Sequence, residues 1–462
     1  MSFKHHDEAR KDAVEACAKL LGSRPTCKAV LLDDIYGKYR LILWPGEEPA
    51  GELAAMANVD LAKAAASFWS DEIWMVSSEI SKLDHQIYDG AWEEGRPCPE
   101  EPRLRIAERH RSKAAWFKQL SEVPWVASRV PGSNQPPIVV FYSFKGGVGR
   151  TTSLASFAIQ RARAGERVVV IDGDLDAPGV GNLLTPDEPG TSPKWGVVDY
   201  LLERPGMQDV DLSDYYHSLR REALFGNEAA GSSSSYYYSQ QREPAGGGHG
   251  EILVFPAGVI NAGYLGKLAR VDFEPTEGGL PTPWPQFLEH IRQQLKPGWI
   301  LMDSRAGLGE SAGIFLGGVA HLHVLFGTST EQSWQGLQLV LERLGAERVR
   351  AGKPQAECLL VEAMVPEDPT TAKKVKEQFN VRAQDEFEDH YYAEDPTEEG
   401  DDAMWFVRDA VAKDAPHRPV PISYRQSLAH FGQLDDVVPA LLNEEYQLLE
   451  QRICERFLEA QQ

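Results

Sequence analysis

The sequence predicts an α/β protein in which a doubly wound, mostly parallel sheet with flanking helices follows a smaller N-terminal α/β domain. Three observations support this prediction. Short β-branched apolar runs alternate with helical segments, a glycine-rich turn joins one run to a helix, and a Pro/Gly-rich stretch precedes this alternation. The 462 residues could hold three domain-sized portions and can bury a substantial core.

The predicted strands of the large sheet are apolar runs that end in polar or glycine-containing loops. They lie at 138–143, 167–172, 252–256, 299–303, 322–326 and 358–364, with a last short strand near 421–423. Residues 131–137, PGSNQPP, cannot continue a helix and are predicted to be a linker. The chain is therefore expected to contain an N-terminal domain at 1–130, this linker and a larger domain at 138–462.

The N-terminal domain is expected to be mixed α/β. A helix is predicted at 7–21, strands at 28–32 and 39–44, and further helices after Asp60 and Pro102. Its basic run at 103–118 interleaves arginine and lysine with Trp116 and Phe117. Such a run can bind nucleic acid through phosphate contacts and stacking, or it can be an amphipathic helix whose solvated face is basic.

Two segments are expected to be exposed insertions. Residues 226–250 are rich in serine, tyrosine and glycine, a composition that cannot pack a core. Residues 385–402 carry ten carboxylates and no lysine or arginine, so self-repulsion favours a solvated loop. A binding site for a basic partner is the alternative for the second segment.

Composition and cysteine spacing exclude several classes of protein. A formal net charge of −22 disfavours binding to nucleic acid by bulk charge, although a local basic patch could still bind. The five cysteines are odd in number and far apart, so they lack the paired spacing of a zinc site and are expected to be reduced thiols. Neither an export signal nor a membrane span is recognisable, which predicts a cytoplasmic protein.

The most informative stretch is KGGVGRTT at 145–152, which joins a predicted strand to a predicted helix. Glycines at such a junction let backbone N–H groups converge on an anion, and the helix N-terminus adds its dipole. A phosphate-binding loop is therefore predicted. In the ordinary P-loop pattern, GxxxxGK[ST], a glycine would stand at Phe144 and the lysine at Arg150, and the sequence departs from the pattern at both positions.

This loop resembles the deviant Walker A motif, KGGxGK[ST], of ParA/MinD-like (SIMIBI class) P-loop ATPases, in a KGGVGR-type subgroup. The resemblance implies that Lys145 reaches the phosphates of the partner across a nucleotide-sandwiched dimer. It also implies that Arg150, in place of the second lysine, contacts the β- and γ-phosphates, and that Thr151 ligates Mg²⁺. The implied cofactor-binding residues of the loop are Gly146, Gly147, Val148, Gly149, Arg150, Thr151 and Thr152.

Two later segments resemble the switches of the same family. The carboxylate-rich stretch at 168–179 is similar to switch I, which implies that Asp174 orients the attacking water and that Asp172 supports the magnesium shell. Asp176 is an additional candidate there, with a solvated loop acid as the alternative. The stretch at 299–308 resembles Walker B and switch II, which implies that Asp303 lies by the magnesium and Gly307 near the γ-phosphate. Lys145, Arg150 and Asp174 are thus the implied catalytic residues.

Loops beyond the later strands are candidates for contacts with the base and ribose. Ligands of doubly wound folds bind beyond the carboxyl ends of the strands. The candidate loops are 326–333, Val365-Pro366 and 421–424, and Pro366 is the residue expected to bind the cofactor. Ordinary turns are the alternative for each loop.

Arg150 affects the predicted chemistry in two ways. A guanidinium makes planar, bidentate contacts with phosphate, which suits tight nucleotide binding. It is also bulkier than an ammonium and spreads its charge, so hydrolysis is expected to be slow. The resemblance implies an ATPase that uses ATP and Mg²⁺, forms a nucleotide-dependent homodimer, controls a protein partner through the N-terminal domain and acts in bacterial antiviral defence.

Other functions are open at this point. One is a nucleotide-binding scaffold with negligible hydrolysis, and another is a nucleic-acid-binding partitioning or sensing ATPase that uses the basic run. In MinD a C-terminal amphipathic helix carries the protein to membranes, but here residues 434–462 have seven acids and two arginines. An anionic bilayer repels such a helix, so it is expected to pack along the domain or against a partner.

Overall fold

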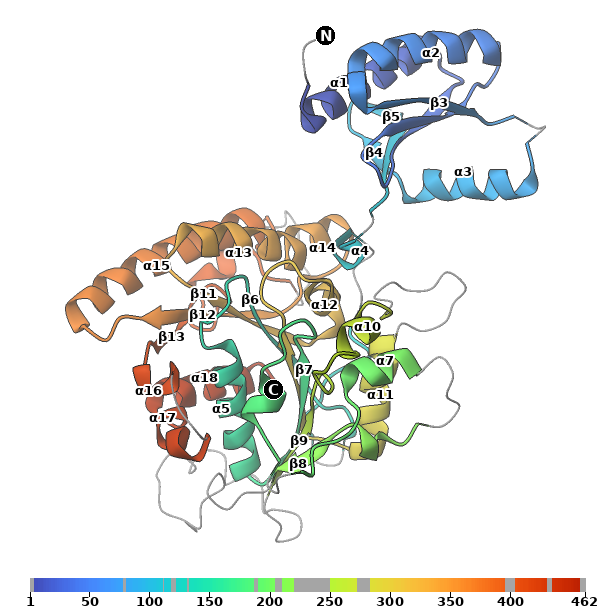
Figure 1. The fold of residues 1–462 in the computed structure, drawn as a ribbon. Coiled ribbons are helices and arrows are strands. Elements are labelled where there is room, and N and C mark those ends of the chain that lie inside the picture. Colours follow the sequence, from blue (N-terminus) through green and yellow to red (C-terminus); the bar gives the residue numbers. More distant parts are fainter. Residues whose placement is uncertain are drawn as a thin grey trace. The chain divides into compact units, whose positions relative to one another are not determined.

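The computed structural model of the protein contains two compact units, Met1–Ser112 and Lys113–Gln462, which are described separately here (Figure 1). The predicted insertion at 226–250 lies outside the described residues except for Gly250, as do residues 395–402 of the acidic segment. The described residues are 4–77, 80–110, 112–117, 122–130, 133–186, 190–203, 210–219, 250–271, 283–394, 404–429 and 434–457.

The N-terminal unit is a sheet with helices on both faces (Figure 1). Its described strands form the order β3-β2-β1-β5-β4. Helices α1 and α2 pack on one face through a cluster of buried apolar side chains, and α3 covers the other face. The elements are α1 (His6–Gly22), β1 (Lys28–Asp33), β2 (Tyr39–Trp44), α2 (Ala50–Ala65), β3 (Trp69–Met75), α3 (Lys82–Glu94), β4 (Arg96–Cys98) and β5 (Glu101–Glu108).

The predicted helix after Pro102 is wrong, because this stretch is strand β5, which pairs in parallel with β1. The helix expected after Asp60 begins earlier, at Ala50. Arginines of the basic run make contacts within the unit. Arg103 lies 2.6 Å from the Glu101 carboxylate, Arg105 donates to the Trp92 carbonyl at 2.7 Å, and Arg109 pairs with Glu94.

The described part of the larger unit holds an eight-stranded sheet in the order β13-β12-β11-β6-β10-β7-β9-β8. Neighbouring strands are parallel except for β8 and β9. All seven predicted strands are confirmed to within two residues, whereas the three-residue β8 was not predicted. The strands are β6 (Ile138–Ser143), β7 (Arg167–Gly173), β8 (His217–Leu219), β9 (Glu251–Phe255), β10 (Trp299–Ser304), β11 (Leu322–Gly327), β12 (Cys358–Val365) and β13 (Val420–Ser423).

Helices cover both faces of this sheet, which explains why its strands are apolar on both sides (Figure 1). In β6, Val140 and Tyr142 belong to the core under α7, α11, α13 and α15, whereas Val139 and Phe141 belong to the core under α5 and α18. The α-helices in the described part of this unit are α4 (Ala114–Phe117), α5 (Arg150–Arg163), α6 (Val180–Leu183), α7 (Val197–Glu203), α10 (Tyr264–Leu268), α11 (Pro283–Leu295), α12 (Glu310–Ile314), α13 (Glu331–Leu344), α14 (Ala346–Arg350), α15 (Pro369–His390), α16 (Gln426–Ala429), α17 (Val438–Leu441) and α18 (Glu444–Glu455).

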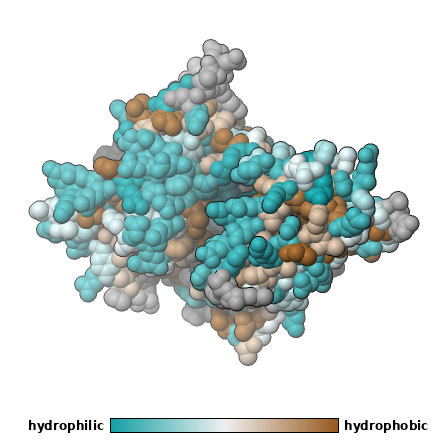
Figure 2. Space-filling view, turned by 90° about the horizontal axis from the view of Figure 1, so that it is seen from above, coloured by the Kyte–Doolittle hydropathy of each residue, from teal (hydrophilic) through white to brown (hydrophobic). Residues whose placement is uncertain are grey.

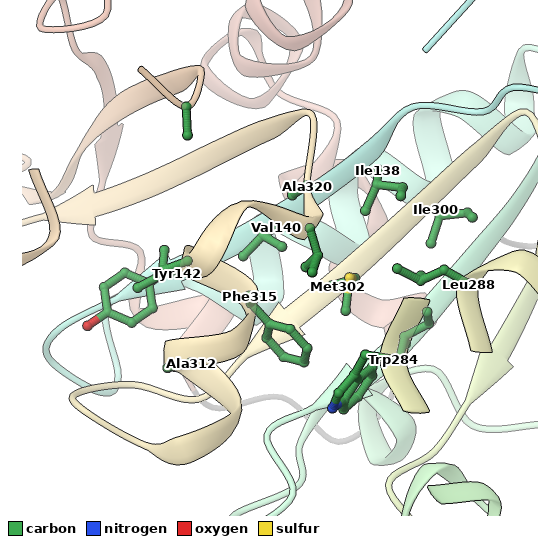
Figure 3. Close-up of a cluster of buried hydrophobic side chains, with 14 of the residues drawn as sticks. Ile138, Val140, Tyr142, Trp284, Leu288, Ile300, Met302, Ala312, Phe315 and Ala320 are labelled. Atoms are coloured by element: carbon green, nitrogen blue, oxygen red, sulfur yellow. The ribbon is translucent and has the colours of Figure 1, made fainter. Parts of the chain in front are cut away.

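The first of these cores includes residues of the segment between β10 and β11. Figure 3 shows Trp284 of α11 beside Phe315, which follows α12, and Met302 of β10 near both rings. The rings of Trp284 and Phe315 meet edge to face, with centroids 4.8 Å apart. Packing of this kind fixes the segment between β10 and β11, which begins at one of the predicted switch regions.

Two further expectations concern the C-terminal third. The predicted acidic loop at 385–402 is wrong for residues 385–390, which complete α15, and Glu386 there is buried against Gln338 and Arg382. The C-terminal helix α18 packs along the domain as expected, with Leu449 and Ile453 buried in the core beside α5.

The surface seen in Figure 2 is mostly hydrophilic, with hydrophobic residues in separate groups. Within the part of the chain that the structure describes, no helix is long and apolar enough to cross a membrane. All five cysteines are buried and free.

The two units divide before Lys113, whereas the composition break that predicted the linker lies at 131–137. Residues between these positions contact the larger unit. Arg129 forms an ion pair with Glu166 at 2.8 Å, and Trp125 packs beside His321. Side-chain contacts thus attach the residues between Lys113 and the predicted linker to the larger unit. Composition alone cannot indicate such contacts.

Candidate functional site

The carboxyl ends of β6, β7 and β10 lie side by side in the sheet and bring the three predicted motifs to one edge. Asp303 of β10 is in register with Asp172 of β7 on one side and with Phe141 of β6 on the other. Residues more than 100 positions apart therefore lie within one or two strand spacings, each about 4.8 Å.

The glycine-rich loop connects β6 to α5, as predicted. Gly147 and Gly149 have φ angles of +74° and +86°. These values lie in the left-handed region, which residues other than glycine adopt only at an energetic cost. A Cβ atom placed on Gly146, Gly147 or Gly149 would meet no other atom within 4 Å. The loop therefore borders open space, and Lys145 is exposed beside it.

Arg150, the first residue of α5, lies among the acids of the other two motifs. Its Nε donates to Asp303 Oδ1 at 2.6 Å, and its Nη2 lies 3.4 Å from Asp174 Oδ2. Thr151 donates its hydroxyl to the second oxygen of Asp303 at 2.7 Å. Both carboxylate oxygens of the buried Asp303 are thus engaged, and the structure brings four predicted site residues into one network.

Asp172 is the other buried acid of the site. Its Oδ2 accepts from the backbone N–H groups of Gly179 and Gly181 at 3.1 and 3.2 Å, while its Oδ1 is buried without a hydrogen-bond partner among the described residues. Burial, together with the nearby charge of Asp303, raises the pKa of Asp172 to about 7. Burial also raises the pKa of Asp303, although Arg150 and Thr151 oppose this effect.

The donor set of the site fits Mg²⁺. The free oxygen of Asp172, the hydroxyl of Thr151 and the carboxylate of Asp303 are hard oxygen donors of the kind that this ion prefers. Among the residues that the structure describes, no three His, Cys, Asp or Glu side chains form a metal site by themselves. In proteins Mg²⁺ commonly binds through one or two carboxylates together with substrate phosphates.

The segment after β10 is tied to the start of the glycine-rich loop. Gly307, with φ +71°, donates its N–H to the Ser143 carbonyl at 3.1 Å and accepts from the Tyr142 hydroxyl at 3.2 Å. Arg305 forms an ion pair with Asp176. Asp176, which the sequence left open as a solvated loop acid, thus links the two predicted switch segments.

The candidate loops for the base and ribose follow β11, β12 and β13. Pro366 is half-buried directly after β12, which lies two strands from β6, a separation of about 10 Å. In the loop after β11, Thr328 donates its N–H to Ser333 Oγ at 2.9 Å.

The sequence did not single out two residues near this edge. Glu362 of β12 is buried, and its Oε1 has no hydrogen-bond partner in the described part of the chain; burial raises its pKa to about 7 although Lys376 opposes the effect. The sequence feature that could have indicated Glu362 is its position as the one acid in the otherwise apolar run CLLVEAMV. Phe144 packs so closely on α13 that a Cβ on Gly336 would lie 1.9 Å from its ring. Nothing in the local sequence indicates that contact.

Comparison with curated proteins finds short similar segments. The iron-sulfur cluster carrier protein of Pseudomonas fragi is 41% identical over 68 residues, which are 14% of this chain and 23% of that protein. An uncharacterized ATP-binding protein of Methanocaldococcus jannaschii is 45% identical over 47 residues, 10% of this chain and 18% of that protein. The chain thus spans about a fifth of the length of these relatives.

Solved structures with a similar fold cover more of the chain. A putative plasmid partition protein of Borrelia burgdorferi bound to AMPPNP is 16% identical, with 70% of this chain and 98% of that chain covered and a TM-score of 0.38. A septum site-determining protein MinD of Pyrococcus horikoshii complexed with Mg-ADP is 18% identical, with 52% and 77% covered and a TM-score of 0.32.

A family model matches the centre of the chain. It describes the CobQ/CobB/MinD/ParA nucleotide binding domain and covers residues 139–379, more than half of the 462 residues. These residues include the glycine-rich loop, both acid-bearing strands and the segment after β10. The chain therefore belongs to the CobQ/CobB/MinD/ParA nucleotide-binding family, as a ParA/MinD-like P-loop protein.

Proposed function

We propose that the protein is an ATP-binding and ATP-hydrolysing molecular switch that dimerises around Mg-ATP and controls a partner protein. The network of Arg150, Thr151, Asp174 and Asp303 beside the glycine-rich loop carries this proposal. Dimerisation, control of a partner through the N-terminal unit and a role in bacterial antiviral defence rest on the sequence resemblance.

The proposed chemistry assigns a task to each group. Backbone N–H groups of the glycine-rich loop, Lys145 and Arg150 would bind the phosphates, and Pro366 would lie against the base. Thr151, Asp172 and Asp303 would hold Mg²⁺, which neutralises phosphate charge when bound. Asp174 would accept a hydrogen bond from the attacking water and orient it in line, since phosphoryl transfer needs positioning more than covalent catalysis.

Binding in this scheme is an exchange of ion pairs. Arg150 is held by Asp303 and Asp174 in the structure, and in this scheme its guanidinium turns toward a phosphate and leaves at least one of these acids. Release of Asp303 and Asp174 would make these acids available for the metal and the water. Phosphate binding would therefore prepare the acids for their roles.

Phosphate release tests the proposal. We expect Asp174→Asn to bind ATP and to keep the ATP-dependent increase in mass seen by light scattering, but to lose phosphate release. Asp176→Asn is the matched control, because Asp176 lies in the same loop and pairs with Arg305. The switch proposal fails if ATP changes neither the mass nor the phosphate level and Lys145→Ala alters nothing.

A nucleotide-binding scaffold with negligible hydrolysis is the second candidate. The observation in its favour is that Arg150 is paired with both acids that hydrolysis would use. A scaffold would bind ATP and change its mass while releasing no phosphate. Wild-type phosphate release that disappears in Asp174→Asn would exclude it.

A nucleic-acid-binding partitioning or sensing ATPase is less well supported. Arg103 and Arg109 of the basic run pair with Glu101 and Glu94, which reduces the charge available to a polyanion. If this function holds, charge reversal at Arg105 and Arg109 should weaken binding to DNA or RNA and reduce its dependence on salt.

A further inference from the structure

Residues 113–117 lie directly against the segment that follows the site acid Asp303. Lys113 is the first residue of the larger unit, so this segment, which contains α4, is where the chain arrives from the N-terminal unit. Helix α4 packs on α12, which begins at Glu310. Only a few residues of chain separate α12 from Gly307, the residue implied to lie near the γ-phosphate.

Three contacts attach the segment to the start of α12. The indole N–H of Trp116 donates to the Gly309 carbonyl at 2.8 Å, and the Lys113 N–H donates to the carboxylate of Glu310. The Trp116 ring also covers Gly313, where a Cβ would lie 2.8 Å from Cδ1. Lys113 itself has a φ of +64°, a strained value for a lysine, so the contacts hold the backbone in a costly conformation.

Helix α13 provides a second connection between the site and the same segment. The buried Arg343 donates to the carbonyls of Trp116 and Ala115 at 2.8 and 2.7 Å. Gly336 lies seven residues, about two turns, before Arg343 and so on the same side of the helix. Since Gly336 supports the ring of Phe144, the residue before Lys145, α13 contacts both the glycine-rich loop and residues 113–117.

We propose that residues 113–117 carry the nucleotide state of the site to the N-terminal unit through α12 and α13. This inference rests on the proposed function, because it requires that nucleotide binding moves the 303–310 segment or Phe144. The Gly309 carbonyl and the Glu310 carboxylate that hold residues 113–117 belong to the 303–310 segment. Two arrangements of that segment would make different contacts with Trp116, which is the condition for coupling two sites.

Hydrogen–deuterium exchange in the full chain tests this coupling. Wild-type protein is compared with and without AMPPNP and Mg²⁺, and peptides covering the glycine-rich loop and residues 110–117 are followed. We expect nucleotide to change exchange in both peptides. Trp116→Phe keeps the ring but removes the hydrogen bond to Gly309, and we expect it to lose the nucleotide-dependent change at 110–117 while the loop stays protected.

Trp125→Phe is the matched control. Trp125 is also half-buried and donates its indole N–H to a backbone carbonyl, that of Pro136 at 2.9 Å, away from α12. It should retain the change at 110–117. The coupling is overturned, and the proposed function kept, if nucleotide protects the loop without altering 110–117 or if both variants lose the change equally. Absence of any nucleotide effect on the wild-type loop would overturn both proposals.

Discussion

Arg150 is the residue at which this site departs most from a lysine-based loop. Its planar guanidinium contacts Asp303 through Nε and approaches Asp174 through Nη2, a fixed fork of donors that the rotatable ammonium of a lysine lacks. The residue therefore restrains two acids at once in the structure.

Arg150→Lys tests this restraint. We expect faster phosphate release at saturating ATP, by roughly 10-fold, because the loss of one charge-assisted hydrogen bond to an acid changes the barrier by about 1.4 kcal/mol. Arg305→Lys is the control, since Arg305 pairs with Asp176 at the edge of the same site. Slower release by Arg150→Lys than by wild type would contradict the idea that Arg150 restrains the acids.

Glu362 provides a prediction about pH and stability. Burial raises its pKa from 4.5 to about 7, so the folded chain binds more protons than the unfolded chain between these values. Its contribution to stability therefore falls as pH rises from about 4.5 to about 7 and then levels off. The ionised form costs roughly 3 kcal/mol at pH 8.

Glu362→Gln removes this titration. We expect a higher melting temperature than wild type at pH 8 and little difference at pH 5, measured by calorimetry. Glu377→Gln on the exposed side of α15 is the matched control and should change neither value. A difference between Glu362→Gln and wild type that is the same at both pH values would show that titration is not the cause.

Some of these residue contacts could be anticipated from the sequence and others could not. The strand-to-helix position of KGGVGRTT indicated Arg150 and Thr151, and apolar strands ending in acids indicated Asp172 and Asp303. The pairing of Arg150 with Asp303 depends on the register of β6, β7 and β10 across 150 residues of chain, which no local pattern contains.

At the scale of elements, α13 joins the glycine-rich loop to the rest of the sheet unit. Gly336→Ala should displace the Phe144 ring, because the added Cβ would lie 1.9 Å from it. We expect about 10-fold weaker ATP binding by titration calorimetry, since a shift of Phe144 misplaces the neighbouring loop N–H groups. Gly266→Ala in α10 is the control, because its Cβ would meet only Arg270, at 3.8 Å.

A second substitution separates displacement of the loop from general damage to α13. Phe144→Ala combined with Gly336→Ala removes the clash, so the double variant should bind ATP better than the product of the two single effects predicts. Strictly additive losses would contradict a direct contact between these residues.

Elements with clear hydrophobic patterns were predicted well, and β5 shows why others failed. In EPRLRIAE the apolar Leu104 and Ile106 alternate with arginines, a period of two that indicates a strand, yet the density of charge suggested a solvated helix. Arg103 donates hydrogen bonds to the Glu101 carboxylate and Arg105 to the Trp92 carbonyl, so both charged side chains have partners within the strand's surroundings. The prediction for residues 385–390 was wrong for the same reason, because Glu386 is buried and accepts a hydrogen bond from Gln338 of α13.

At the scale of the whole molecule, the boundary between the units can be tested by truncation. A chain of residues 113–462 should be more stable than one of residues 138–462, because the shorter piece lacks Arg129. Burial alone would raise the pKa of Glu166, but Arg129 and Arg161 lower it to about 2, so loss of one arginine leaves a poorly compensated buried charge.

We expect the shorter piece to lose roughly 2–4 kcal/mol, measured as a lower denaturation midpoint in urea. Arg129→Gln in the chain of residues 113–462 should reproduce part of this loss. Equal stability of the two pieces would indicate that residues 113–137 do not contribute to the larger unit.

The position of the boundary before Lys113 also has a consequence for the fusion of other domains to the nucleotide-binding unit. Residues 113–117 belong by their contacts to the nucleotide-binding unit, which therefore contains both the candidate site and the segment proposed to respond to it. A different domain fused in front of Lys113 would be joined to the same residues 113–117, which would keep the same contacts. Under the proposed coupling, the N-terminal unit could be exchanged without any change to the residues of the site.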